Sequence, residues 1–425
     1  MVKILHFSDT HVSHRRYRDV KDSWKLDQRV TWIEEDYCLG FEQALDIAVQ
    51  TNPDYLVHSG DLFDIPVGRN LIGPSEYSRT YVIKALKKFF NKTKNKIPLI
   101  LIDGNHGAYQ TRNYSTIEFI EAAFPDLVHA FTTYQLRDAI RKSKSLVQEF
   151  DDVKFFLFPY YQFGKLENWA KAYEDWLIKH QQPDPAKISV AVVHGMVRGF
   201  DLHELLLQYK YDYVALGHDH KQRRIKQNAW QAGSTARYTF AERNQEKSVL
   251  EVQIQKGEEP IILPKMIENV REMVQIEIPL KVDMNTAVFE KQIRAHVEKL
   301  KEKYNGQTAT RFKIKFVGAV LLSSWWAMED ILVDLQKEFF TEDFNLLEFR
   351  WDSSEVSKRA PVSLQKGAKV HDYLVEDPEK DFERYIRSLS LEDEKQAKKF
   401  IELGGQIMKE VFKTPVSKIS EEGEK

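Results

Sequence analysis

A chain of 425 residues, with 42% hydrophobic and 30% charged residues, is long enough for two or three globular domains. Its 62 basic and 64 acidic residues nearly cancel, so the formal net charge of −2 excludes a whole-molecule field that attracts nucleic acid, and DNA affinity must come from local basic patches. The single cysteine, Cys38, excludes an intramolecular disulfide and a zinc site built from thiolates. No apolar run approaches the ~18 residues of a membrane span, and the first residues lack the features of a secretory signal. We therefore expect a cytoplasmic protein that does not bind membranes.

Short β-branched runs alternate with amphipathic helical patterns over residues 1–260, which predicts an α/β domain. The strands are expected at Lys3–Phe7, Tyr55–His58, Leu99–Ile102, Val153–Phe158, Ser189–Val193 and Tyr213–Leu216, with helices such as Phe41–Thr51 and Ser78–Phe90 between them. Every one of these strands except Val153–Phe158 runs into a polar cluster. In open α/β sheets, ligands bind outside the carboxyl ends of the strands, so these clusters are candidates for a shared site.

The remainder of the chain predicts smaller units. A stretch with Gly, Glu and Pro at Gln255–Pro264 indicates a domain boundary. Beyond it, a small α+β domain is expected over residues 270–351, with strands at Met273–Ile278, Arg311–Val317 and Leu346–Arg350 and helices at Thr286–Lys303 and Trp325–Phe340. Residues 352–369 have the composition of a linker, 370–416 predict two helices with apolar stripes, and 417–425 form a charged tail.

Five polar motifs follow the predicted strands of the first domain. They are Asp9-x-His11, Gly60-Asp61, Gly104-Asn105-His106, His194-Gly195 and Gly217-His218-Asp219-His220. Each motif alone is typical of a turn or a helix cap, but five of them, each after a β run, indicate a common site. Carboxylate, imidazole and amide oxygen are ligand types that suit Mn, Fe or Zn, and glycines permit the sharp turns that let side chains converge.

The order and spacing of these motifs resemble those of the calcineurin-like metallophosphoesterases. The resemblance implies a metallophosphoesterase β-sandwich flanked by helices, with two divalent metal ions, of which Mn²⁺ is the expected one. It also implies the ligands: Asp9, His11 and His220 for the first ion, Asn105, His194 and His218 for the second, and Asp61 as the bridge. By the same resemblance His106 is no ligand but donates a proton to the leaving oxygen, a role that suits imidazole near neutral pH.

One position departs from the family pattern. Most relatives have Asp or Glu after the G-N-H block, where it pairs with the histidine, but this chain has Gly107. Either another carboxylate, such as Asp64 or Asp103, takes over the pairing, or His106 is a weaker acid here.

Within this superfamily the chain is similar to the SbcD-type nucleases, the meiotic recombination eleven family of DNA double-strand-break repair. The similarity is carried by the block Gly60–Asp64, by Gly233-Ser234 with the aromatic and charged stretch Tyr238–Glu242, and by the position of the small domain, which caps DNA in that family. It implies a homodimeric, Mn-dependent DNA exonuclease and endonuclease, whose C-terminal helices at 370–416 bind the coiled-coil base of an SMC-like ABC ATPase. Because this chain has no G-x-x-x-x-G-K-[ST] loop, that ATPase would be another polypeptide.

Three basic residues near the motifs, Arg15, Arg16 and Arg198, are candidates for contacts to DNA phosphates. Two other functions remain open: a small-molecule phosphodiesterase or phosphatase on the same fold, and a metal-bound scaffold with weak catalysis. The nuclease is favoured, because a small substrate gives little reason for extra domains and a scaffold gives little reason for seven intact ligands.

Overall fold

The computed structural model describes residues 1–14, 24–64, 73–109, 114–160, 169–195, 208–268, 270–304, 310–340 and 346–359, together with Ile401, Leu403 and Gly404. The chain divides into two compact units, Met1–Arg359 and Ala360–Lys425. The helices expected over 370–416 lie almost entirely outside the described residues, as do Arg15, Arg16 and Arg198. Among the described helices, none is long and apolar enough to cross a membrane.

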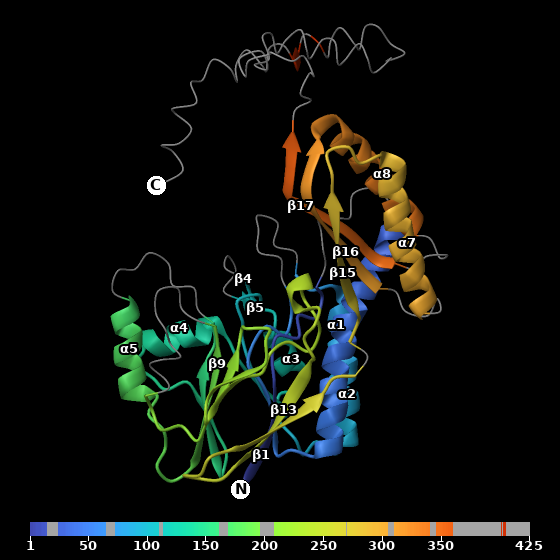
Figure 1. The fold of residues 1–425 in the computed structure, drawn as a ribbon. Coiled ribbons are helices and arrows are strands. Elements are labelled where there is room, and N and C mark those ends of the chain that lie inside the picture. Colours follow the sequence, from blue (N-terminus) through green and yellow to red (C-terminus); the bar gives the residue numbers. More distant parts are fainter. Residues whose placement is uncertain are drawn as a thin grey trace. The chain divides into compact units, whose positions relative to one another are not determined.

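Two six-stranded sheets form the first lobe, residues 1–266, and pack face to face (Figure 1). The first sheet has the order β14 (Ile261–Met266), β13 (Ser248–Ile254), β1 (Val2–Phe7), β2 (Tyr55–His58), β3 (Leu99–Ile102) and β6 (Val128–Phe131). The second has the order β11 (Arg223–Lys226), β12 (Ala229–Gln231), β10 (Tyr213–Gly217), β9 (Ile188–His194), β8 (Val153–Phe158) and β7 (Val147–Glu149). The expected sandwich flanked by helices is confirmed.

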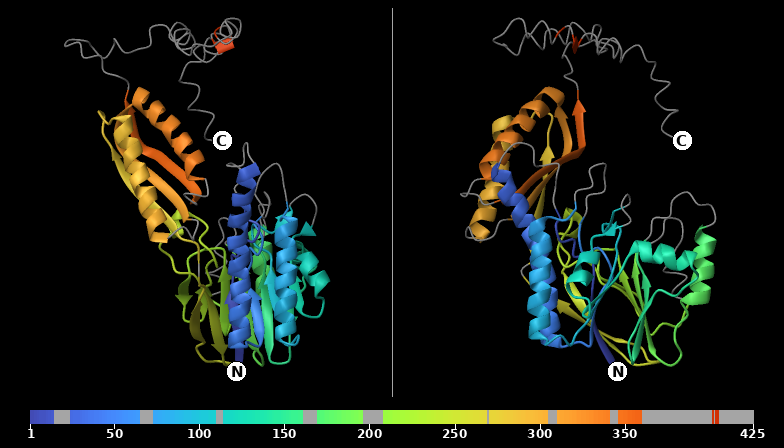
Figure 2. Two further views of the ribbon diagram at one scale, coloured as in Figure 1. Left: turned by 90° about the vertical axis from the view of Figure 1, so that its right-hand side faces the viewer. Right: turned by 180° about the vertical axis from the view of Figure 1, so that it is seen from behind.

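The predicted strands are continuously apolar because both faces of each sheet are covered. In β1, Ile4 points into the core between the sheets, whereas Leu5 and Phe7 belong to the core under the outer helices. Figure 2 shows α1 (Trp24–Thr51) and α2 (Glu76–Lys92) side by side over this outer face. The other helices of this lobe are α3 (Glu118–Ala123), α4 (Thr133–Arg141) and α5 (Trp169–His180), with a short hairpin of β4 (Ala108–Tyr109) and β5 (Tyr114–Ser115) and a turn of 3₁₀ helix, η2 (Phe240–Glu242).

The second lobe comprises residues 273–359 and covers the region 270–351 in which a small α+β domain is expected. Its strands β15 (Met273–Leu280), β16 (Thr310–Leu321) and β17 (Leu346–Arg359) form one parallel sheet, because α7 (Thr286–Tyr304) and α8 (Leu322–Phe339) provide the crossovers. Both helices pack on one face of this sheet, where Phe289, Phe316 and Trp325 are buried. Trp325 is therefore a core residue, whereas Trp326 is 55% exposed.

Two predicted boundaries are wrong. The first domain does not end at residue 260, within the stretch Gln255–Pro264. Strand β14 continues to Met266, pairs with β13 and extends the first sheet. Nor does a linker begin at residue 352, because β17 continues to Arg359 along β16. The charged residues that give this stretch the composition of a linker form ion pairs across the two strands instead. Lys313 of β16 pairs with Asp352 of β17 at 2.9 Å, and Lys315 pairs with Glu355 at 2.7 Å.

Candidate metal centre

The five motifs meet at one edge of the sandwich. They follow β1, β2, β3, β9 and β10, and because β1, β2 and β3 are parallel in one sheet and β9 and β10 in the other, their carboxyl ends lie together. The side chains of Asp9, His11, Asp61 and His194 are buried, and His218 is exposed. The site is thus held by strand ends of both sheets and is open at one side.

The backbone at the first two motifs is held in an uncommon conformation. Asp9, His11 and Asp61 have positive φ angles of 50°, 45° and 55°. This left-handed region is unfavourable for most residues with side chains, so the surrounding structure must enforce it. Two backbone hydrogen bonds do so: the Asp9 N–H donates to the Gly60 carbonyl and the His11 N–H to the Asp61 carbonyl, both at 3.0 Å. The two motifs are therefore fixed to each other as one turn structure.

A first cluster consists of Asp9, His11 and His220, whose ligand atoms all lie within 4.8 Å of one another. The Nε2 atoms of His11 and His220 are 3.0 Å apart, and Asp9 Oδ1 is 4.0 Å from His11 Nε2. Two imidazole nitrogens and a carboxylate that point at one another form the donor set of a transition-metal ion.

A second cluster consists of Asp61, His194 and His218, again within 4.8 Å. Asn105 joins it, because its Oδ1 lies 3.0 Å from His194 Nε2 and 2.9 Å from His218 Nδ1. Asp61 Oδ2 is 3.2 Å from His194 Nε2 and 3.9 Å from His11 Nε2, so this carboxylate lies between the clusters. The seven predicted ligands are therefore brought together as two adjoining groups.

The chemistry of the donor set fits divalent cations. Burial on its own lowers the pKa of His194, but the Asp61 and Asp9 carboxylates and the Ser59 carbonyl outweigh it and raise that pKa to about 9. A site that draws a proton onto a fully buried imidazole favours positive charge. The carboxylates and imidazoles of these clusters make them able to bind divalent metal ions.

Two motif glycines allow this convergence. A side chain at Gly104 would collide with the Asp61 carboxylate, and one at Gly60, which has φ of 102°, would collide with the His194 ring. Only a residue without Cβ fits at these positions.

His106 lies beside the clusters and is held at two points. Its backbone N–H donates to Asp61 Oδ1 at 2.8 Å, and its ring Nδ1 donates to Asp64 Oδ1 at 2.6 Å. Of the carboxylates considered for the pairing, Asp64 is the one in contact. Asp103 instead accepts hydrogen bonds from the Ser115 hydroxyl and the Thr133 N–H. A Cβ at position 107 would lie 3.0 Å from Asp103 Oδ1, so the glycine leaves room for this buried carboxyl group.

Sequence reasoning missed three side chains around the clusters. The Tyr238 hydroxyl donates to Asp64 Oδ2 at 3.2 Å, and its ring centroid lies 4.7 Å from that of His11. Glu242 accepts a hydrogen bond from His220 Nδ1 at 3.1 Å. The Tyr160 ring is stacked on His218. Tyr238 and Glu242 could have been found from the sequence, because they lie in the aromatic and charged stretch Tyr238–Glu242. Tyr160 is in none of the motifs.

Comparison with known proteins gives the following matches. Residues 2–222 match the family model described as calcineurin-like phosphoesterase. The "DNA double-strand break repair protein Mre11" of Thermoplasma acidophilum is 28% identical over 290 residues, 64% of this chain and 67% of that protein. The protein of the same name from Saccharolobus solfataricus is 35% identical over 114 residues, 27% of this chain and 25% of that protein. A Staphylococcus epidermidis protein, named as one subunit of the nuclease SbcCD, is 24% identical over 289 residues, 60% of this chain and 67% of that protein.

Proposed function

Because the chain belongs to the calcineurin-like phosphoesterase family, we propose that it is a Mn²⁺-dependent nuclease that hydrolyses DNA phosphodiester bonds as an exonuclease and endonuclease. The observation that carries the proposal is the two adjoining ligand clusters with His106 beside them. The names of the similar proteins, which are DNA repair proteins and part of a nuclease, support DNA as the substrate.

We assign Asp9, His11 and His220 to one ion, Asn105, His194 and His218 to the other, and Asp61 to both. Two bound divalent cations would polarise the phosphate and lower the pKa of the attacking water. The chain's own contribution is to fix the positions of seven ligands on strand ends that are tied together by backbone hydrogen bonds.

His106 is the proposed general acid. Its Nδ1 is taken by Asp64, so its Nε2 is the ring nitrogen left to donate a proton to the leaving oxygen. Burial lowers the pKa of His106, but the hydrogen bond to Asp64 and the Asp61 charge raise it above its ordinary value overall. The protonated form that an acid needs is thereby favoured.

The partners are proposals of the same kind. Residues 370–416 would bind the coiled-coil base of an SMC-like ATPase, the chain would act as a homodimer, and both would work on DNA in the cytoplasm. The staphylococcal relative is named as one subunit of a nuclease, which supports a partner polypeptide.

The test is a comparison of substrates. Protein purified with Mn²⁺ is assayed on linear DNA, on hairpin DNA and on bis-p-nitrophenyl phosphate, each with and without a chelator. Chelator-sensitive cleavage of DNA and of the small diester is expected. Hydrolysis of the small diester with no cleavage of either DNA would favour a small-molecule phosphodiesterase, and inactivity on all three would favour a scaffold.

A further inference from the structure

The segment Ser234–Lys247, which joins β12 to β13, provides no proposed metal ligand but lies against the first cluster. Ser234 forms an isolated β-bridge with Ser8, the residue before Asp9. Glu242, at the end of η2, has a side chain that is 7% exposed. The mechanism proposed above gives this buried carboxylate no role.

Glu242 contacts the proposed metal ligand His220 at the ring nitrogen that faces away from the first cluster. Its Oε1 accepts a hydrogen bond from His220 Nδ1 at 3.1 Å, while His220 Nε2 points at His11. Metal-binding histidines commonly donate their second ring N–H to a carboxylate, which fixes the ring orientation and makes the other nitrogen a better ligand. Glu242 has this relation to His220, the ligand contributed by the last motif.

Several bonds keep Glu242 in place. The N–H groups of Tyr238 and Thr239 each donate to its carboxylate at 3.2 Å. The Lys247 ammonium, which is 2% exposed, donates to its Oε2 at 2.6 Å and to the His220 carbonyl at 3.2 Å. Lys247 therefore holds both the carboxylate and the backbone of the histidine that the carboxylate orients.

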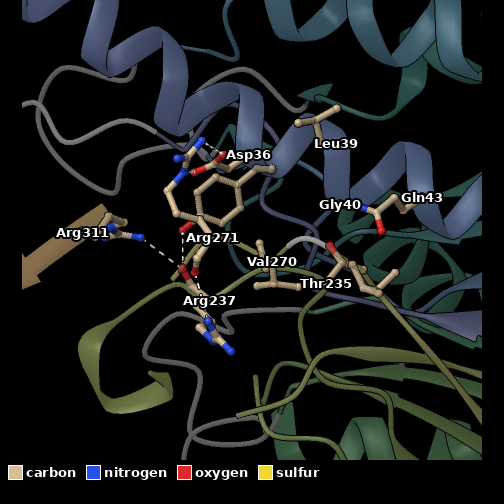
Figure 3. Close-up of a pocket in the computed structure, with 12 residues that line it drawn as sticks. Asp36, Leu39, Gly40, Gln43, Thr235, Arg237, Val270, Arg271 and Arg311 are labelled. Carbon is tan, nitrogen blue, oxygen red and sulfur yellow. Dashed lines mark hydrogen bonds and ion pairs between the residues drawn. The ribbon is translucent and has the colours of Figure 1, made fainter. Parts of the chain in front are cut away.

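The second lobe also contacts this segment. The buried Arg311 of β16 donates from Nη1 to the Arg237 carbonyl at 3.2 Å, and its guanidinium lies 5.8 Å from the centre of the Phe240 ring. Figure 3 shows Arg311 directed at the Arg237 backbone, next to the ion pair of Arg271 with Asp36. Arg311 of β16 thus contacts the segment at Arg237 and Phe240. Lys247, at the end of the segment, binds Glu242.

We propose that Glu242, held by Lys247, is a positioning residue for His220 that sets the affinity of the first ion independently of the second. The inference rests on the proposed two-ion centre, but its test is metal binding measured without DNA.

The experiment titrates Mn²⁺ into metal-free wild type and into Glu242→Gln by calorimetry. The variant should bind one of the two ions about 10- to 100-fold more weakly and the other with unchanged affinity. Because Glu242→Gln leaves the Lys247 charge buried without its carboxylate, the double variant Glu242→Gln/Lys247→Met is measured as well, and circular dichroism confirms that each variant is folded. The matched control is Glu251→Gln on β13, a buried carboxylate paired with Lys265 at 3.2 Å, which should bind both ions as the wild type does.

Combination with ligand variants identifies the ion. In a His218→Ala background, Glu242→Gln should still weaken the ion that remains, whereas in a His220→Ala background it should change nothing further, because the residue it positions is gone. Wild-type affinity for both ions in folded Glu242→Gln, or equal weakening of both, would overturn the inference. Selective weakening in a protein that cleaves no DNA would instead contradict the nuclease proposal alone.

Discussion

His106 and Asp64 form a hydrogen bond of 2.6 Å between residues that lie 42 positions apart in the sequence. Asp64 also accepts hydrogen bonds from His14 Nδ1 and from the Tyr238 hydroxyl. One carboxylate therefore connects the three loops that carry His14, His106 and Tyr238. Burial opposes its ionisation, but the hydrogen bonds from His106 and its neighbours hold the pKa of Asp64 well below its usual range. The lowered pKa favours the carboxylate form of Asp64, which can pair with an imidazolium at His106.

The Asp64→Asn variant should lower kcat on DNA by about 10- to 100-fold, because His106 loses the charge that favours its protonated form and fixes its ring. Bis-p-nitrophenyl phosphate should be less affected, since p-nitrophenolate leaves without needing a proton. Steady-state rates on both substrates check this. An equal loss on both would show that Asp64 supports the centre generally rather than the acid.

The His106→Ala variant should keep its metal ions and its DNA affinity while kcat falls by about 10²- to 10⁴-fold, since proton donation acts in the transition state. Metal content, a DNA-binding titration and turnover are measured on the same preparation. A variant with the wild-type rate would mean that His106 is not the acid.

The Asp61→Ala variant should lose hydrolysis of every phosphodiester. The Asp61 carboxylate lies between the two clusters and also accepts a hydrogen bond from the His106 backbone N–H. Elemental analysis should find fewer ions per chain than in the wild type. Full activity on any diester would refute the assignment of Asp61 as the bridge.

Truncation after Lys369 should leave Mn²⁺-dependent hydrolysis of bis-p-nitrophenyl phosphate intact, because Met1–Arg359 is a compact unit that contains all seven proposed ligands. The truncated chain should no longer co-purify with the ATPase. Retention of the ATPase at full affinity would place the docking site elsewhere.

The adjacent tryptophans of α8 provide a stability test with an internal control. Trp325→Ala should lower the free energy of unfolding by about 3–5 kcal/mol, because it removes a buried side chain that packs edge-on against Phe316. Trp326→Ala removes a side chain that is 55% exposed and should cost well under half as much. Chemical denaturation of both variants compares them, and similar losses would contradict the assigned core.

The sequence predicts the strands of the sandwich well because they are buried on both faces, so that each reads as a continuous apolar run. It fails at β14 and at the end of β17, where strands on a solvent-facing edge carry Lys, Glu and Pro and resemble loops. The convergence of the five motifs could be predicted because each of them lies at the end of a strand. The contacts of Tyr238 with Asp64 and of Glu242 with His220 could not, because they join segments 174 and 22 residues apart and leave no periodic pattern.

The pairing of β1 with β13 also affects the order of folding. Strand β1 leads directly to Asp9 and His11. One of its two neighbouring strands, β13, comes from the far end of the first lobe. The two strands are antiparallel and pair from Val2 with Ile254 to His6 with Leu250. Until the ribosome has released that later strand, β1 has an open edge with unpaired backbone groups, which can associate with other chains. Because such long-range pairing is slow to form, we expect the strand end that carries Asp9 and His11 to be fixed only near the end of folding of this lobe.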